Sequence, residues 1–178
     1  MQIDSILFLN LLRGGWASPD PPHGGYMKLF DILEKNAIIA DLVSNDKQGV
    51  LKELAIAVSE SAKTESDEIL KVLLEREKLG STGIGGGIGI PHGKLKSINS
   101  IIVGFGRSIK GVEFDSLDNR PVYIFFLLLT PENSTGSHLR VLAHISKLLK
   151  NDDFKDNLLN AESIDEIREI ISEQDEEF

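Results

Sequence analysis

Apolar residues recur at helical spacing in two neighbouring stretches of the chain. Residues 47–62 place apolar side chains at i, i+3, i+4 and i+7, which predicts an amphipathic helix, and Asn45 or Asp46 is a suitable N-cap. Residues 66–79 repeat the pattern, and Gly80 predicts the end of this second helix. The inward positions are Leu51, Leu54, Ala55 and Val58 in the first helix and Ile69, Leu70, Leu73 and Leu74 in the second.

Two continuous apolar runs follow, at residues 100–106 and 122–129. Both are rich in Ile, Val and Phe, and neither alternates with polar residues, so they predict strands that are buried on both faces. Helices on either side of such strands indicate an α/β sandwich.

The last third of the chain predicts three further helices. They cover about residues 137–150, 152–159 and a final segment that opens on a capping box at residues 163–166. The final helix is expected to bury Ile164, Ile167, Ile170 and Ile171. The acidic tail from Glu173 onward is expected to fray.

The first 26 residues differ in character from the rest. A short apolar run is followed by a segment rich in Gly and Pro, and Asp4 stands where a secretory signal would carry positive charge. We therefore interpret residues 1–26 as a leader or an added segment, expected to be disordered, and residues 27–178 as one domain.

Composition narrows the possible chemistry. The chain has no cysteine, which excludes disulfide scaffolds and thiol enzymes, and its formal net charge of -9 argues against nucleic-acid binding. No apolar stretch approaches the roughly 20 residues of a membrane span. The expectation is a cytoplasmic protein without membrane insertion, whose chemistry comes from His, carboxylate, Arg, Lys or backbone groups.

Residues 83–94 are unusually rich in glycine and contain His92. The dinucleotide-binding pattern and the Walker pattern both fail here, because Ile88, Ile90 or His92 falls where a glycine is required. A flexible linker is the alternative interpretation, but three isoleucines are unusual in a linker, so the segment favours backbone packed closely beneath a reactive group. Pro91 stiffens the approach to His92, and Gly93 is expected to leave one side of the ring open.

Other side chains are candidates for the same site. Helical spacing extends the inward stripe of residues 137–150 to His138 and directs His144 toward solvent, which disfavours a zinc site that uses both. Arg76 ends the helix before the glycine segment and is suited to a bidentate pair with a phosphoryl group. Thr82 is a further hydroxyl donor. Each could instead be structural or merely exposed.

With these pieces in place, the sequence resembles the type-2 (fructose/mannitol-like) enzyme IIA family of the bacterial phosphoenolpyruvate phosphotransferase system, and most of all its nitrogen-regulatory members. The matching stretches are residues 76–85, 88–95, 111–122 and 137–142. Gly86 departs from the pattern, since family members often carry Asn there. The resemblance implies an α/β fold with a mixed β-sheet flanked by helices on both faces, like that of mannitol IIA.

The resemblance also implies a phosphotransferase component. His92 would accept a phosphoryl group from HPr or its nitrogen-branch paralogue, His138 would stabilise that group, and Arg76 would neutralise and orient it. Thr82, Gly85, Gly87, Pro91 and Gly93 would support the site. No cofactor or metal is implied.

Three functions remain open from the sequence. They are a regulatory phosphocarrier that acts on target proteins, a IIA component that passes phosphate to the IIB domain of a sugar permease, and an interaction module without phosphorylation. The acidic charge either steers a basic donor protein or only keeps the chain soluble.

Overall fold

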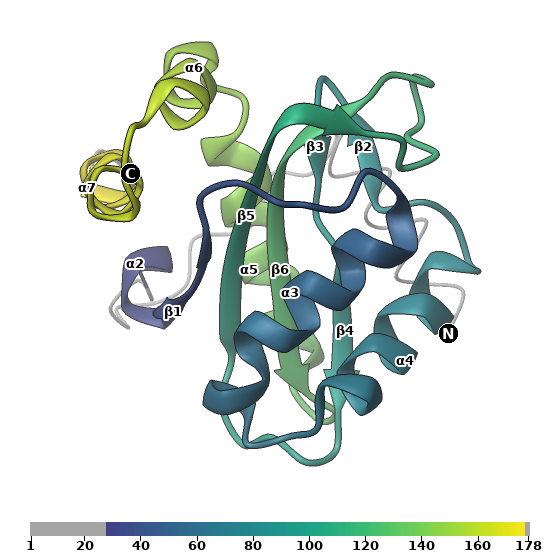
Figure 1. The fold of residues 1–178 in the computed structure, drawn as a ribbon. Coiled ribbons are helices and arrows are strands. Elements are labelled where there is room, and N and C mark those ends of the chain that lie inside the picture. Colours follow the sequence, from purple (N-terminus) through teal and green to yellow (C-terminus); the bar gives the residue numbers. More distant parts are fainter. Residues whose placement is uncertain (1–27, 177–178) are drawn as a thin grey trace.

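A six-stranded mixed sheet forms the centre of the molecule in the computed structural model, which describes residues 28–176 (Figure 1). The strand order is β1-β5-β6-β3-β2, and β4 also pairs with β6. The central pair β5/β6 is antiparallel, whereas β1 runs parallel to β5, and β3 and β4 run parallel to β6. The strands are β1 (Leu33–Ile39), β2 (Gly83–Gly85), β3 (Ile88–Gly89), β4 (His92–Leu95), β5 (Ile102–Val112) and β6 (Val122–Pro131).

Helices cover both faces of this sheet, as the resemblance implied. Helices α3 and α4 pack on one face, and α5, α6 and α7 pack on the other (Figure 1). Neighbouring residues of β6 therefore enter different cores: Phe125 faces α3 and α4, and Phe126 faces the other group. Burial on both faces explains why β6 shows no alternation of apolar and polar residues. The helices are α2 (Leu29–Ile32), α3 (Lys47–Ala62), α4 (Ser66–Glu77), α5 (Thr135–Leu148), α6 (Asp152–Asn160) and α7 (Ile164–Glu176).

The long predicted elements are confirmed with small shifts at their ends. Helix α3 has the predicted bounds, and the Asp46 side chain caps it by accepting from the amide of Gly49 at 2.9 Å. Helix α4 ends two residues before the predicted Leu79. Both predicted strands extend further, to Val112 and Pro131, because they pair with each other along a longer hairpin.

The C-terminal predictions were partly wrong. Ile167 and Ile171 are fully buried, but Ile164 is 38% exposed because it lies at the very start of α7. The acidic tail does not fray at Glu173, since α7 continues to Glu176 and the Asp175 side chain is buried against α2 and α5. The predicted leader, residues 1–26, lies outside the described residues.

Within residues 28–176, no helix combines the length and the apolar character needed to cross a bilayer.

Candidate functional site

His92 is the first residue of β4 and is paired with Leu128 of β6. Because side chains alternate along a strand, His92 and Gly93 face opposite sides of the sheet. A Cβ atom on Gly93 would lie 2.5 Å from a side-chain carbon of Val72 in α4, so this glycine is required by the packing of α4 rather than by access to the ring. His92 consequently faces α5, and its side chain is almost fully buried.

The hydrogen bonds of the His92 ring define its tautomer. Nδ1 lies 2.8 Å from the carbonyl oxygen of Ile90, and a carbonyl oxygen only accepts, so Nδ1 carries the hydrogen. Nε2 is therefore unprotonated, and it accepts a hydrogen bond from Nε of Arg76 at 3.0 Å. The ring presents one lone pair, at Nε2, and a guanidinium group lies directly in front of it.

The surroundings of His92 disfavour a positive charge on its ring. Burial is the largest cause, and the Arg76 guanidinium adds to it, so that the pKa of His92 falls from 6.5 to about 3. His138 and Lys94 act in the same direction, and the hydrogen bond to Ile90 opposes them. His92 is thus neutral throughout the physiological pH range.

His138 lies in the first turn of α5 and faces the domain interior, as helical spacing predicted. Its ring packs edge-on against that of His92, with ring centroids 5.3 Å apart and an interplanar angle of 61°. Nδ1 of His138 lies 2.8 Å from the hydroxyl oxygen of Thr130, at the end of β6. The structure therefore brings both predicted histidines together, and Thr130 orients the second.

The prediction that His144 faces solvent was only partly right, because its side chain is 24% exposed. Its Nε2 lies 2.5 Å from a carboxylate oxygen of Asp175, because α7 packs across this part of α5. The sequence pattern of α5 alone could not show that another helix covers its outer side. Within residues 28–176, no three His or acidic side chains gather in a way that could hold a metal ion.

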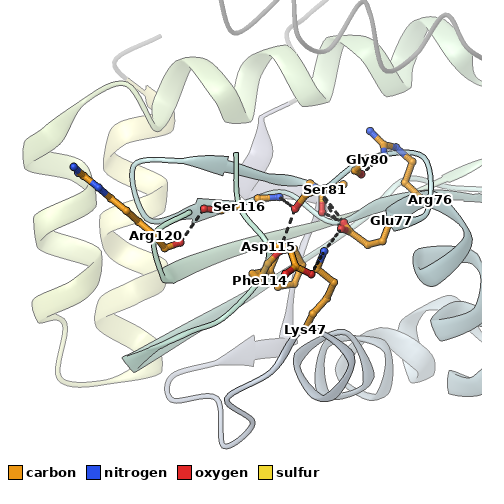
Figure 2. Close-up of polar contacts among 11 residues, drawn as sticks. Lys47, Arg76, Glu77, Gly80, Ser81, Phe114, Asp115, Ser116 and Arg120 are labelled. Carbon is orange, nitrogen blue, oxygen red and sulfur yellow. Dashed lines mark hydrogen bonds and ion pairs between the residues drawn. The ribbon is translucent and has the colours of Figure 1, made fainter. Parts of the chain in front are cut away.

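Arg76 occupies the last turn of α4 and is held at two points. Nε donates to His92, and Nη1 donates to the carbonyl oxygen of Gly80 at 2.9 Å (Figure 2). The planar guanidinium group is thereby fixed beside Nε2, where it could form paired hydrogen bonds with an anionic oxygen. The prediction that Arg76 lies at His92 agrees with this geometry.

The glycine-rich segment forms a tight β2–β3 hairpin. Gly85, Gly86 and Gly87 all have positive φ, at 93°, 63° and 78°, which strongly favours glycine. The amide of Gly86 donates to the Asp118 carboxylate at 2.9 Å. Pro91 is buried after the hairpin, and its carbonyl accepts from the amide of Leu128 at 2.9 Å. Gly85 and Gly87 thus shape the hairpin that precedes His92 in the chain, and Pro91 adjoins it.

Thr82 makes contacts that the sequence did not suggest. Its hydroxyl donates to the Glu77 carboxylate, and that carboxylate also accepts from the Thr82 amide. Lys47 of α3 completes this group through an ion pair with Glu77 at 3.1 Å (Figure 2). Sequence reasoning singled out neither Glu77 nor Lys47, although Glu77 stands inside one of the matching stretches.

Comparison with known proteins agrees with the geometry. The family model described as "Phosphoenolpyruvate-dependent sugar phosphotransferase system, EIIA 2" matches residues 31–174. A nitrogen regulatory protein of Bradyrhizobium diazoefficiens is 39% identical over 132 residues, which cover 74% of this chain and 86% of that protein. A fructose-specific EIIABC component of Bacillus subtilis is 36% identical over 150 residues, or 84% of this chain, but the chain spans only 24% of that protein's length.

A solved structure confirms the predicted fold. The nitrogen regulatory protein IIA-Ntr of Neisseria meningitidis superimposes with a TM-score of 0.76 at 32% identity, covering 80% of this chain and 98% of that one. EIIA domains are phosphotransferase components that carry phosphoryl groups. From its matched residues and its fold, the chain belongs to the EIIA 2 family of the phosphoenolpyruvate-dependent phosphotransferase system.

Proposed function

We propose that His92 is the phosphoryl acceptor of this phosphocarrier and that Nε2 is the reacting atom. The observation that carries the proposal is the fixed neutral tautomer: Nδ1–H is held by the Ile90 carbonyl, and the Nε2 lone pair faces Arg76. A buried, unprotonated imidazole nitrogen beside a guanidinium is suited to attack a phosphorus atom and to keep the transferred group.

In the proposed step, the Nε2 lone pair forms a bond to phosphorus while the bond from phosphorus to the donor nitrogen breaks. The donor nitrogen keeps the electron pair of the broken bond. Positive charge develops on the His92 ring, and the hydrogen bond from Nδ1 to Ile90 stabilises it. Since Arg76 now donates to Nε2, its guanidinium must turn from the ring nitrogen to the phosphoryl oxygens as the donor enters.

His138 is the second proposed contact of the phosphoryl group. When its Nδ1 accepts from the Thr130 hydroxyl, its Nε2 carries the hydrogen and can donate to an equatorial oxygen. The buried hydrogen bond to Thr130 and the edge-on contact with His92 restrict the ring to one orientation. Arg76 would then neutralise charge and His138 would donate a hydrogen bond, neither of them with a covalent role.

The phosphoryl donor that we propose is the phosphohistidine of HPr or of its nitrogen-branch paralogue, in the cytoplasm. We further propose a regulatory output on target proteins. The match over 86% of a nitrogen regulatory protein, at 39% identity, supports this reading. The second candidate is a IIA component that passes phosphate to the IIB domain of a fructose- or mannitol-type permease, which the fructose-specific relative favours.

The test of the chemistry is incubation with phosphoenolpyruvate, enzyme I and HPr, followed by mass spectrometry. One acid-labile phosphoryl group should appear on the wild-type protein and none on His92→Ala. The control is His144→Gln, because its amide can still donate to Asp175 and it lies outside the site. No adduct on the wild type, or an adduct that survives His92→Ala, would exclude the proposal.

A second experiment separates the two candidate functions. The phosphorylated protein is mixed with a fructose-type IIB domain, and the loss of its phosphoryl group is followed in time. Transfer within seconds favours the sugar-permease role, whereas retention of the group favours the regulatory role.

A further inference from the structure

Glu77 follows Arg76 in the chain, but its side chain has other partners: Arg76 contacts His92, whereas Glu77 contacts Thr82 and Lys47. Figure 2 shows the Glu77 carboxylate between Lys47 and the segment that begins at Gly80. The Glu77 side chain is only 5% exposed. A carboxylate that is withdrawn from water to this degree destabilises the fold unless hydrogen bonds and a counter-charge compensate it.

Both kinds of compensation are present. The amide of Thr82 lies 3.0 Å and 3.2 Å from the two carboxylate oxygens, and the Thr82 hydroxyl donates to one of them. Lys47 Nζ lies 3.1 Å from Oε2 of Glu77 and 3.1 Å from the largely exposed Asp115. Because Thr82 itself is fully buried, its amide and hydroxyl depend on Glu77 for their hydrogen bonds.

From Thr82 the contacts continue to the reacting ring. The carbonyl oxygen of Thr82 accepts from the amide of Ile90 at 2.9 Å. The carbonyl oxygen of the same Ile90 accepts Nδ1–H of His92 at 2.8 Å. A continuous line of hydrogen bonds therefore joins Glu77 to the group that fixes the tautomer of His92.

The same segment also supports Arg76. The carbonyl oxygen of Gly80, two residues before Thr82, accepts from Nη1 of Arg76 at 2.9 Å. Glu77 thus anchors a short piece of chain that holds both groups at the reacting nitrogen: the ring through Ile90 and the guanidinium through Gly80.

We propose that Glu77, with Lys47 as its counter-ion, is a positioning residue for phosphoryl transfer: through Thr82 it fixes the Ile90 carbonyl that sets the His92 tautomer and the Gly80 carbonyl that holds Arg76. Glu77 itself touches no reacting atom. This inference rests on the proposed role of His92, and its test includes a measurement that does not depend on phosphorylation.

The test compares Glu77→Gln with Glu75→Gln, which removes the same charge from an exposed position on the same helix. Two properties are measured on the folded proteins: the nitrogen-15 NMR shifts of the His92 ring, which report the tautomer, and the kinetics of phosphorylation by phosphorylated HPr. We expect Glu77→Gln to increase the share of rings with the hydrogen on Nε2. We also expect it to lower kcat by on the order of tenfold at an unchanged KM, since a small misplacement of reacting groups suffices for such a loss. Glu75→Gln should match the wild type in both.

Lys47→Met provides a second variant, which decides the matter if Glu77→Gln does not fold. Lys47 is partly exposed, and its replacement removes the counter-ion but leaves Glu77 and Thr82 in place. Its matched control is Asp115→Asn, which removes the other partner of Lys47 at an exposed position. We expect Lys47→Met to shift the His92 tautomer in the same direction by a smaller amount, and Asp115→Asn to shift nothing.

A purely structural role predicts a different pattern. In that case the Glu77→Gln protein unfolds at a lower denaturant concentration, but the folded protein keeps the wild-type tautomer and kcat, and this result would overturn the proposal. An increase in KM alone would also overturn it. If the wild type accepts no phosphoryl group, the proposed function fails, and the tautomer of His92 in Glu77→Gln still decides whether Glu77 positions the ring.

Discussion

Lowering the pH from 7 to 5 should destabilise the folded protein through His92, among other groups. The ring has a pKa of about 3 in the folded state and 6.5 as its ordinary value, because burial and the Arg76 guanidinium disfavour its charged form. Between about pH 3 and pH 6.5, the unfolded chain binds a proton on this ring that the folded chain does not bind. The free energy of unfolding therefore falls as the pH falls through this window, by up to about 1.4 kcal/mol per pH unit.

The expected loss follows from the same two pKa values. Integrating the difference in bound protons from pH 7 to pH 5 gives a loss of about 2 kcal/mol from His92 alone. This figure depends little on the folded-state value, because a ring with any pKa well below 5 stays neutral over the whole interval. A loss of this size is a large fraction of the stability of a typical domain.

The assay is urea denaturation of the wild type and of His92→Asn at pH 7, 6 and 5. The asparagine amide can still donate to the Ile90 carbonyl, and the variant keeps every other titrating group. The difference between the two proteins therefore isolates His92. The wild type should lose about 2 kcal/mol more than the variant between pH 7 and pH 5. Equal losses would show that the folded ring titrates at its ordinary pKa, and would refute the assignment of Nε2 as a permanently unprotonated nucleophile.

Three further predictions concern the framework. Arg107→Met should destabilise the protein by roughly 3 kcal/mol in urea, because the buried guanidinium donates to four carbonyl oxygens, one just after β1 and three around the end of α6; a loss below 1 kcal/mol would contradict this role. Gly93→Ala should cost about 1–3 kcal/mol, because the added Cβ meets a valine of α4 at 2.5 Å, and an unchanged midpoint would show that α4 yields freely. Asp175→Asn should speed hydrogen exchange at the amide of Phe30, since Asp175 bridges that amide and His144; exchange at the wild-type rate would mean that the bridge does not hold α2.

The sequence predicted those elements that bury one regular stripe or a continuous apolar run. Helix α3 has the predicted bounds because its apolar spacing and its Asp46 cap are both local signals. Strand β1 escaped prediction, since Glu34, Lys35 and Asn36 are exposed between its buried ends. What makes it a strand is its parallel pairing with β5, which no local pattern shows.

The residues of the candidate site also differ in whether a local sequence pattern marks them. His92 could be singled out because glycines and a proline surround it, and His138 because it continues an apolar stripe. Glu77 and Thr130 could not be singled out by physical reasoning, because each is defined by a contact with a residue on a different element or after a turn. The face that His144 presents depended likewise on where α7 packs.

The alternation of β4 explains why the chemistry and the packing of this site are inseparable. Gly93 faces α4 and permits a close approach of that helix, and the close approach brings Arg76, at the end of the same helix, to the edge of the sheet. His92, one residue earlier, faces α5 and meets His138. A shift of β4 by one residue against β6 would turn His92 toward α4 and Gly93, which has no side chain, toward α5. The hydrogen bond from Leu128 to the Pro91 carbonyl opposes that shift, so it is the register of this short strand, rather than any single contact, that puts the two histidines and the arginine around one nitrogen atom.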